Sequence, residues 1–522
     1  MKKTLCVILS VLLAVCLLTG CGGGKGDDGS EKVLKFGCFC YSSTLDPGDD
    51  TNAAWDVMRM GLSECLFKFD DSMTVQFALC DDYSTEDNIT WVFHIRDGLK
   101  FSNGTDVTPS LVVASIENVY ANETGTSRPR KYMDYESMTA DDAARTVTIV
   151  LKAPQVDLRK NLAYPVFAIL DTTGDFDWDE HPIGTGPYAL VDYEAKVSAN
   201  LVRNEYYWNG DVPFDKLEIY YLGDAGAKTM ALQSGDVDLV ENITSAADLK
   251  MFKEDKNYNV SIAQGVRCGF AYMNHNGILA DPVLRHAILK ALDDDTLCNV
   301  TLGGLYTPGY SCLPSGLAYG YDNLVDPDPY DVAEANRILD EAGYVDTDGD
   351  GIREKDGKNI KLLYLTYTNR GLADFADGIV VSLKEIGIDI DLKVIDSDSL
   401  WNNMVNGEFD LAGNNWTTVG TGDPTEYLAN WYSGYVGTDA NGNWNGYKNA
   451  KFDELYEKLA TTYDEAERAL IIQEMQQILL DDAALLVHGY YNSSMESNTS
   501  IENVKIHTAD YYWITNEITP AK

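Results

Sequence analysis

The sequence predicts an α/β protein with two or three lobes, and three observations carry this prediction. The chain has 522 residues, of which 45% are hydrophobic, as in an ordinary globular protein. This length exceeds what one hydrophobic core usually serves. In the second half, strand-like runs alternate with helix-like runs, which indicates β-α-β units and a parallel sheet. No repeat of 20–50 residues is visible, which argues against solenoids and propellers.

The N-terminal segment has the pattern of an export signal. Lys2 and Lys3 precede an apolar run from Leu5 to Leu18, which is too short to span a bilayer comfortably and is typical of a signal-peptide core. The run ends in Leu18-Thr19-Gly20-Cys21, which resembles the lipobox of bacterial lipoproteins. The alternative is an ordinary secretory signal that a cysteine follows by chance. We expect residues 1–20 to be removed, Cys21 to carry a lipid anchor, and the glycine- and charge-rich residues 21–30 to form a flexible tether.

In the first half, the expected elements are mainly strands. Residues 33–45 read as a strand that runs into a turn, and residues 89–95 place alternate apolar side chains on one face of a strand. Asp97-Gly98 predicts a turn, with a return strand that begins at residues 100–101. A helix is expected near residues 110–120.

In the second half, helix caps and a β-α-β unit stand out. Asp331 and Glu334 have capping-box spacing, and the helix that they begin ends at Gly343. Asp464 and Glu467 begin another helix, which runs through Leu480. The expected β-α-β unit and final strand are a strand at 360–368, a helix at 372–387, a strand at 388–395 and a strand at 484–492.

The charge balance excludes some partners. The chain has 40 basic and 82 acidic residues, a net charge of −42. Such a surface repels nucleic acid and anionic lipid, so we expect neither as a partner and expect a well-solvated monomer. Seven cysteines follow Cys21, an odd and scattered set without a C-x-x-C pair, which favours buried free thiols.

Motifs for catalysis are not visible. The sequence has no H-E-x-x-H, no G-x-S-x-G and no G-x-G-x-x-G after a strand, so neither catalysis nor a cofactor is expected. Asp346, Asp348 and Asp350 have the spacing of positions 1, 3 and 5 of a calcium-binding loop, but Gly357 stands at position 12, where a glutamate is needed. A calcium site and a solvated acidic hairpin therefore both stay open.

Aromatic residues are abundant: 32 Tyr, 9 Trp and 15 Phe. Core packing explains most of them. Several, however, lie in Gly- and Asn-rich stretches such as 414–435 and 441–449. Aromatic side chains in such loops favour a groove that stacks on a ligand.

Several segments together resemble a known family, the extracytoplasmic solute-binding proteins of ABC transporters that bind oligopeptides, dipeptides or nickel (family 5). The resemblance covers residues 33–515 and is carried, in order, by residues 91–108, 182–210, 231–243, 283–316, 335–358, 383–396, 407–416 and 452–491. It implies a bilobal periplasmic-binding-protein-like fold with two hinge strands and an extra subdomain in the first lobe. The implied ranges are 31–75, 205–270 and 493–522 for the first lobe, 76–204 for its extra subdomain and 276–487 for the second lobe.

The same resemblance implies a ligand site between the lobes. Trp416 corresponds to the stacking tryptophan of the family's peptide binders, in which an aspartate for the peptide's α-amino group follows a few residues later. Here Thr417, Thr418, Val419 and Gly420 follow instead, and Asp423 matches an Asp-Pro that is usually structural. Tyr41, Tyr490 and Tyr491 are the other expected aromatic contacts, and Arg370 is expected to pair with an acidic end of the ligand.

The implied function is a receptor, lipid-anchored on the extracytoplasmic face of the cell membrane, that passes a peptide-like solute to ABC permease and ATPase subunits. Within the same fold, the alternatives are a metal chelate, an opine-like metabolite or an oligosaccharide as ligand. A pheromone-sensing receptor would share every feature above. A surface hydrolase is the rival from another class, and it needs a nucleophile or paired acids that the sequence does not indicate.

Overall fold

The computed structural model describes residues 31–522 except 40–41, 125–126, 175–176 and 438–441. The predictions for the signal peptide, the anchor Cys21, the tether and Tyr41 fall outside the described residues. Within the described part, no helix combines the length and the apolar character that crossing a bilayer requires.

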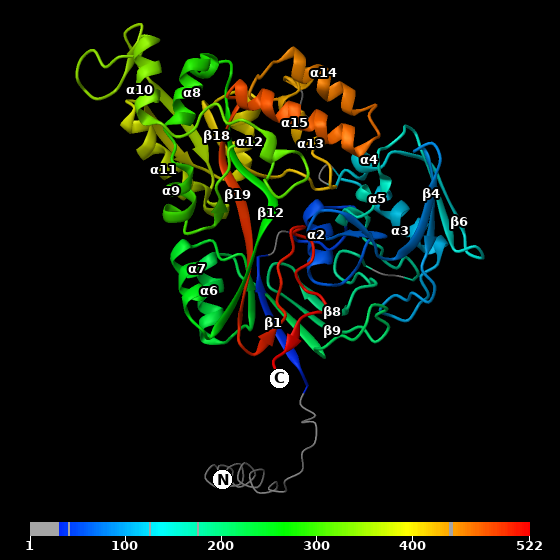
Figure 1. Cartoon of the computed structure of the whole chain (residues 1–522). Coiled ribbons are helices and arrows are strands. Elements are labelled where there is room, and N and C mark those ends of the chain that lie inside the picture. Colours follow the sequence, from blue (N-terminus) through cyan, green and yellow to red (C-terminus); the bar gives the residue numbers. More distant parts are fainter. Residues whose placement is uncertain (1–30, 40–41, 125–126, 175–176, 438–441) are drawn as a thin grey trace, which may run out of the picture.

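One mixed sheet of 11 strands runs through the molecule (Figure 1). Its neighbouring strands are, in order, β17 (Asp389–Val394), β16 (Lys361–Thr366), β18 (Leu411–Thr417), β12 (Tyr258–Met273), β19 (Leu485–Asn498), β11 (Leu239–Glu241), β1 (Val33–Cys38), β10 (Lys216–Tyr221), β9 (Ser198–Arg203) and β8 (Tyr188–Glu194), with β13 (Tyr306–Thr307) beside β19. β1 pairs in parallel with β10 and β11, and β16 pairs in parallel with β17 and β18.

The fold is bilobal, as the resemblance implied. We call the elements around β1 and β8–β11, together with residues 45–170, which share one hydrophobic core with β1 and β8–β10, the first lobe. The elements around β16–β18 are the second lobe. The long strands β12 and β19 pair antiparallel and belong to both, because β12 also pairs with β18 and β19 also pairs with β11. Their register shifts between Gln264 and Cys268 and again between Gly269 and Phe270, so the two strands are irregular where they pass from one lobe to the other.

Helices cover the second lobe, which is the upper part of Figure 1. The predicted β-α-β unit is confirmed, with α11 (Leu372–Glu385) between the parallel strands β16 and β17. Both predicted caps are also confirmed: Asp331 accepts a hydrogen bond from the Glu334 backbone N–H at 2.9 Å, and Asp464 accepts one from Glu467 at 2.8 Å. The remaining helices of this half are α8 (Pro282–Lys290), α9 (Asp294–Thr296), α10 (Val332–Glu341), α12 (Ser397–Asn406), α13 (Thr425–Leu428), α14 (Ala450–Leu459) and α15 (Glu465–Asp481).

A second sheet belongs to the first lobe. Its strands are, in order, β4 (Cys80–Thr85), β5 (Thr90–Ile95), β7 (Thr146–Leu151) and β6 (Tyr135–Asp141), and α3 (Pro109–Ala121) packs against β6 and β7. The buried face predicted for residues 89–95 is seen at Trp91, Phe93 and Ile95. The predicted return strand at 100–101 is wrong: β5 pairs with β4 and β7, and Lys100 makes only an isolated bridge to Asp106. The Phe101 N–H bonds to the Thr105 carbonyl instead, which closes a local turn.

The other short elements of the first 254 residues are the hairpin β2 (Phe67–Phe69) and β3 (Val75–Phe77), the 3-10 helix η1 (Pro165–Phe167), and the helices α2 (Thr51–Arg59), α4 (Pro129–Tyr132), α5 (Leu158–Asn161), α6 (Ala225–Ser234) and α7 (Ala246–Glu254). The six cysteines described beyond Cys21 are buried, and five of them are free thiols, as predicted: Cys65, Cys80, Cys268, Cys298 and Cys312. Cys38 is the sixth.

Candidate functional site

Two adjoining cavities lie between the lobes. The larger has a volume of about 630 Å³ and lies between α4, α5 and the β2–β3 hairpin on one side and α15 and the loop after β18 on the other. The smaller has a volume of about 190 Å³. The two share Tyr132, Asp423 and Glu426 in their walls. Together they are the candidate ligand site of the fold.

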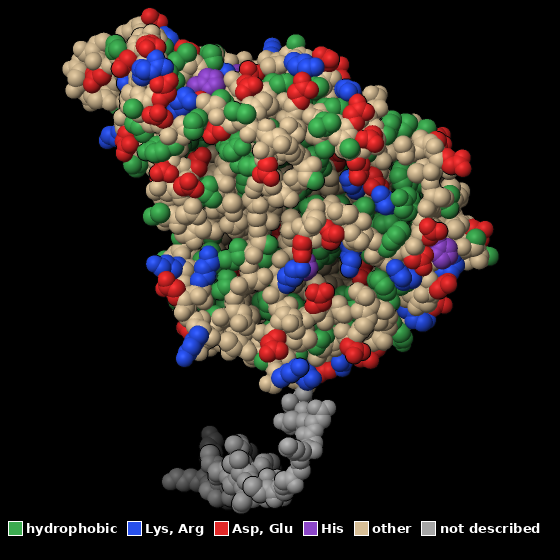
Figure 2. Space-filling view, viewed as in Figure 1, with side chains coloured by type: hydrophobic (Ala, Val, Ile, Leu, Met, Phe, Trp, Pro, Cys, Tyr) green, Lys and Arg blue, Asp and Glu red, His purple; other side chains and the backbone are tan. Residues whose placement is uncertain are grey.

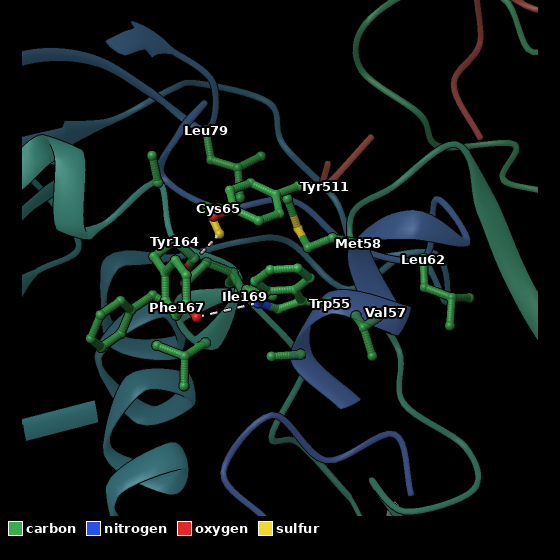
Figure 3. Packing of buried hydrophobic residues seen from close by; sticks show 14 of the residues in the cluster. Trp55, Val57, Met58, Leu62, Cys65, Leu79, Tyr164, Phe167, Ile169 and Tyr511 are labelled. Carbon is green, nitrogen blue, oxygen red and sulfur yellow. Dashed lines mark hydrogen bonds between the residues drawn. The ribbon is translucent and has the colours of Figure 1, made fainter. Parts of the chain in front are cut away.

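Aromatic rings dominate the smaller cavity. Trp55 on α2, Tyr132 on α4 and Tyr164 come from the first half of the chain, and Trp416 and Tyr427 from the second lobe. Trp55 Nε1 donates a hydrogen bond to the Tyr164 hydroxyl at 3.3 Å, and the two rings meet edge to face (Figure 3). Trp416 is only half-buried, as a ring that stacks on a ligand must be. The predicted stacking residue thus lies in the wall of a cavity.

The loop that follows Trp416 is held in place by both lobes. Thr418 donates from its backbone N–H and from its hydroxyl to the Val266 carbonyl, at 2.9 and 2.8 Å. Tyr511 donates to the Gly420 carbonyl at 2.7 Å. Thr417 lies opposite Arg267 in the β18–β12 register and lines the cavity with Thr418. These bonds fix the direction in which Trp416 faces the cavity.

The acids of the site already have partners. Asp423 pairs with Arg468 at 2.7 Å and accepts the Thr425 backbone N–H at 2.9 Å, so its carboxylate is occupied within the second lobe. Glu426 pairs with Lys131 of α4 at 2.6 Å, which joins the two sides of the cavity. Lys160 and Glu465 make a second such pair at 2.6 Å.

Tyrosine hydroxyls in the small cavity stay neutral. Burial raises the pKa of Tyr132 well above its usual value, and the neighbouring Tyr164 and Glu426 act in the same direction. Burial likewise raises the pKa of Tyr164. Both side chains therefore offer the ligand a neutral ring and a hydroxyl rather than a negative charge.

The structure does not bring Tyr490, Tyr491 or Arg370 to these two cavities. Tyr490 is 0% exposed, and its hydroxyl donates to the Ser311 carbonyl at 2.9 Å. Tyr491 is 2% exposed and packs edge to face on Tyr306. The Arg370 guanidinium lies 5.7 Å from the centre of the Tyr491 ring. Protein contacts cover both tyrosines, because β19 is a central strand of the sheet.

A buried cluster of charged side chains packs against Trp55. Arg59 pairs with Asp510 at 2.7 Å, and its guanidinium lies 4.8 Å from the centre of the Trp55 ring. Arg267 approaches Asp510 to 4.0 Å. Burial alone would raise the pKa of Asp510, but Arg59, Arg267 and Arg370 outweigh it and lower this pKa below its usual value.

The calcium-like loop brings its carboxylates together far from these cavities. Asp346, Asp348 and Asp350 each have an oxygen within 4.8 Å of the others and of Glu354, a fourth acid that the sequence analysis missed. Glu354 stands at position 9 of the loop and is buried, and it accepts the Thr347 backbone N–H at 2.7 Å. Calcium binding at this loop stays a prediction.

Trp55, Tyr132 and Tyr164 are site residues that the sequence analysis also missed. Trp55 lies in a mostly buried helix and Tyr164 in a segment of apolar residues, so both read as ordinary core positions. They are recognised as cavity residues only because they line the same cavity as Trp416, which is more than 250 residues away in the sequence.

Residues 74–439 match the model for bacterial extracellular solute-binding proteins, family 5. The chain belongs to this family, whose members serve ABC importers as substrate-binding receptors.

The chain matches its relatives over nearly their whole length, and solved structures share its fold. The chain is 24% identical to the nickel-binding protein NikA of Staphylococcus aureus over 98% of both chains. It is 26% identical to the oligopeptide-binding protein AppA of Bacillus subtilis over 97% of both. Among solved structures, NikA of Brucella suis in complex with Fe(III)-EDTA matches with a TM-score of 0.83 at 22% identity, covering 94% of this chain and 100% of that one.

Proposed function

We propose that this chain is the lipid-anchored receptor of an ABC importer, which captures a peptide-like solute between its lobes and delivers it to permease and ATPase subunits. The observation that carries this proposal is the pair of adjoining cavities between the lobes, with half-buried Trp416 in the wall of the smaller one. Their volumes of about 630 and 190 Å³ together suit a small solute, since ligand pockets usually measure about 300–1,000 Å³. The relatives are named as binding proteins, which favours a receptor over a hydrolase.

A metal chelate is the second candidate ligand. Asp423 is occupied by Arg468, and Glu426 is paired with Lys131, so neither acid of the small cavity is free to receive a peptide's α-amino group in this conformation. The S. aureus relative was solved with Ni(L-His)2 and the B. suis relative with Fe(III)-EDTA. A compact chelate stacked on Trp416 would need no carboxylate of its own.

Trp416→Ala tests the site. Small molecules released from the purified protein are identified by mass spectrometry, and the main one is titrated back by calorimetry. Loss of one stacked ring costs about 1–3 kcal/mol, so we expect roughly 5- to 150-fold weaker binding. The matched control is Trp401→Ala, because Trp401 is 39% exposed on α12 and lines neither cavity. Equal affinities for Trp416→Ala and the unmodified protein would remove Trp416 from the site.

The anchor is tested separately. Cys21→Ala should release the protein from the membrane fraction, because the described residues contain no helix that could hold it there. The test compares membrane and soluble fractions after a salt wash. Retention of the variant in the washed membranes would count against lipid anchoring at Cys21.

A further inference from the structure

A third cavity, of about 260 Å³, lies within the first half of the fold and shares no wall residue with the two cavities between the lobes. Its walls come from the end of α2 and the segment after it, the β2–β3 hairpin, the residues near Tyr207 and the C-terminal segment from Lys505 to Glu517. Figure 2 shows acidic, basic and histidine side chains close together near the middle of the visible face, over the C-terminal segment that is red in Figure 1. The proposed transport function leaves this cavity unused.

Glu64 is the unusual group in its wall. Trp208 Nε1 donates to one carboxylate oxygen at 2.7 Å, and the Tyr207 hydroxyl donates to the other at 3.3 Å. Among the described residues, no basic side chain makes a salt bridge to Glu64 within 4.0 Å, although Lys68 acts on it from a greater distance. Burial raises the pKa of Glu64 to about 7. Glu64 is only partly buried, so its carboxylate stays accessible from the cavity. Carboxylates that are largely removed from water are usually paired with a cation, and this one makes no such salt bridge among the described residues.

Two other acids of the cavity, Asp71 and Asp70, already have partners, and the third, Glu517, is exposed to solvent. Asp71 pairs with Lys505 and, at 3.0 Å, with His507. Asp70 accepts the backbone N–H groups of Ser72 and Thr74 at 2.9 and 3.0 Å. Of the three basic residues in the wall, Lys505 and His507 pair with Asp71, and Lys68 is exposed to solvent. A positive charge that enters the cavity would therefore find a carboxylate without a salt bridge in Glu64.

The remaining walls are largely apolar and aromatic. They include Met58, Phe69, Tyr512 and Ile514. A volume of about 260 Å³ corresponds to roughly eight or nine water molecules at about 30 Å³ each, so only a compact molecule fits. Aromatic faces attract an ammonium group, and apolar walls favour an organic body over a hydrated metal ion.

We propose that this cavity binds a compact organic ammonium ion, with its charged end against the Glu64 carboxylate and its apolar body against Phe69 and Tyr512. The site is separate from the solute site, and its residues do not depend on the second lobe. Binding here therefore does not require the lobes to close. The competing explanation is that the Glu64 carboxyl group serves only to hold Trp208 and Tyr207.

Calorimetry with the purified chain distinguishes the two explanations. Benzylamine is the cationic probe, and benzyl alcohol is a neutral probe of nearly the same shape. We expect benzylamine to bind about tenfold more tightly or better, as hydrogen bonds between charged groups usually provide. Glu64→Gln keeps the shape and an acceptor for Trp208 but removes the charge, so it should abolish the preference for benzylamine. Glu205→Gln is the control, because Glu205 is exposed on the segment that precedes Tyr207 and lines no part of this cavity.

A second measurement needs no variant and stands even if Glu64→Gln fails to fold. The pKa of Glu64 is raised to about 7, so part of the Glu64 population is protonated at pH 7 and a cation that binds the charged form releases protons. The heat of benzylamine binding should then differ between phosphate and Tris buffers, which have different ionisation enthalpies. The proposal is overturned if benzyl alcohol binds as tightly as benzylamine, if binding heat is independent of the buffer, or if no benzylamine binds at millimolar concentration.

Discussion

Asp510 is a buried carboxylate that the fold keeps ionised. It is 6% exposed, Arg59 and Arg267 approach it, and Trp513 Nε1 donates to it at 2.8 Å. Its pKa is lowered in the folded protein, so its pairing stabilises the fold above the unfolded-state pKa of about 3.9. This contribution is lost as pH falls through the lower, folded-state pKa.

Asp510→Asn should therefore destabilise the protein at neutral pH. The change removes the carboxylate that lies 2.7 Å from Arg59 and leaves this buried cation with Asp56 at 3.9 Å, at a cost of about 3 kcal/mol in the free energy of unfolding. Urea unfolding followed by tryptophan fluorescence measures this at pH 7 and near pH 3. The difference between variant and unmodified protein should shrink at the lower pH. Asp134→Asn, at an exposed pair with Lys152, should cost less than about 1 kcal/mol. A pH-independent difference for Asp510→Asn would show that charge is not the cause.

At the scale of elements, β12 and β19 depend on a bend that only glycine tolerates. Gly489 of β19 has a φ of +127°, and a Cβ there would lie 2.6 Å from the Thr307 carbonyl oxygen of β13. Gly489→Ala combines a strained backbone with a clash against main chain, so it should lower the free energy of unfolding by about 1–3 kcal/mol. Gly265→Ala on the partner strand is the control, because its nearest neighbour would be 3.5 Å away. Equal urea midpoints for both variants would contradict this role of Gly489.

The elements predicted well are those whose signals are local. The caps at Asp331 and Asp464 are recognised from residues three positions apart. The β-α-β unit around α11 is recognised from the spacing of apolar residues within each element. The C-terminal part of β19, after residue 492, was not predicted. It continues through Ser493, Ser494 and Glu496, which are buried polar residues of a central strand. With protein on both faces, polar and apolar residues no longer alternate, and the strand signal disappears. The wrong prediction of a return strand at 100–101 came from the turn signal Asp97-Gly98. The chain does turn there, but Lys100 then makes only an isolated bridge to Asp106.

At the scale of the whole molecule, the resemblance predicted the bilobal fold, which is confirmed. Trp416, which the same resemblance named as the stacking residue, lies in a cavity wall, and its contact with a ligand stays a prediction. The opposite wall could not be predicted in this way. Trp55 and Tyr164 lie near Trp416 only because two distant parts of the chain pack together in the folded protein. No local sequence pattern predicts such a contact. The division of the chain into lobes by residue range stays a prediction.

The contacts between the lobes explain how a solute could change the shape of the molecule. The pairs Lys131–Glu426 and Lys160–Glu465 and the bond from Tyr511 to Gly420 exist only while the lobes are together. The two ion pairs have exposed members, so each contributes little alone, about 0–1 kcal/mol. A solute that contacts both Trp55 and Trp416 adds interactions to the closed form alone and shifts the population toward it.

Small-angle X-ray scattering of the purified protein, with and without the solute identified by mass spectrometry, tests this central claim most directly. The solute-free sample is prepared by unfolding, dialysis and refolding, and its recovery is checked by calorimetric titration of the same solute. The radius of gyration should fall on saturation, and Trp416→Ala should need more solute for the same fall. An unchanged radius at saturating solute, with binding verified by calorimetry, would contradict closure of the lobes on a captured solute.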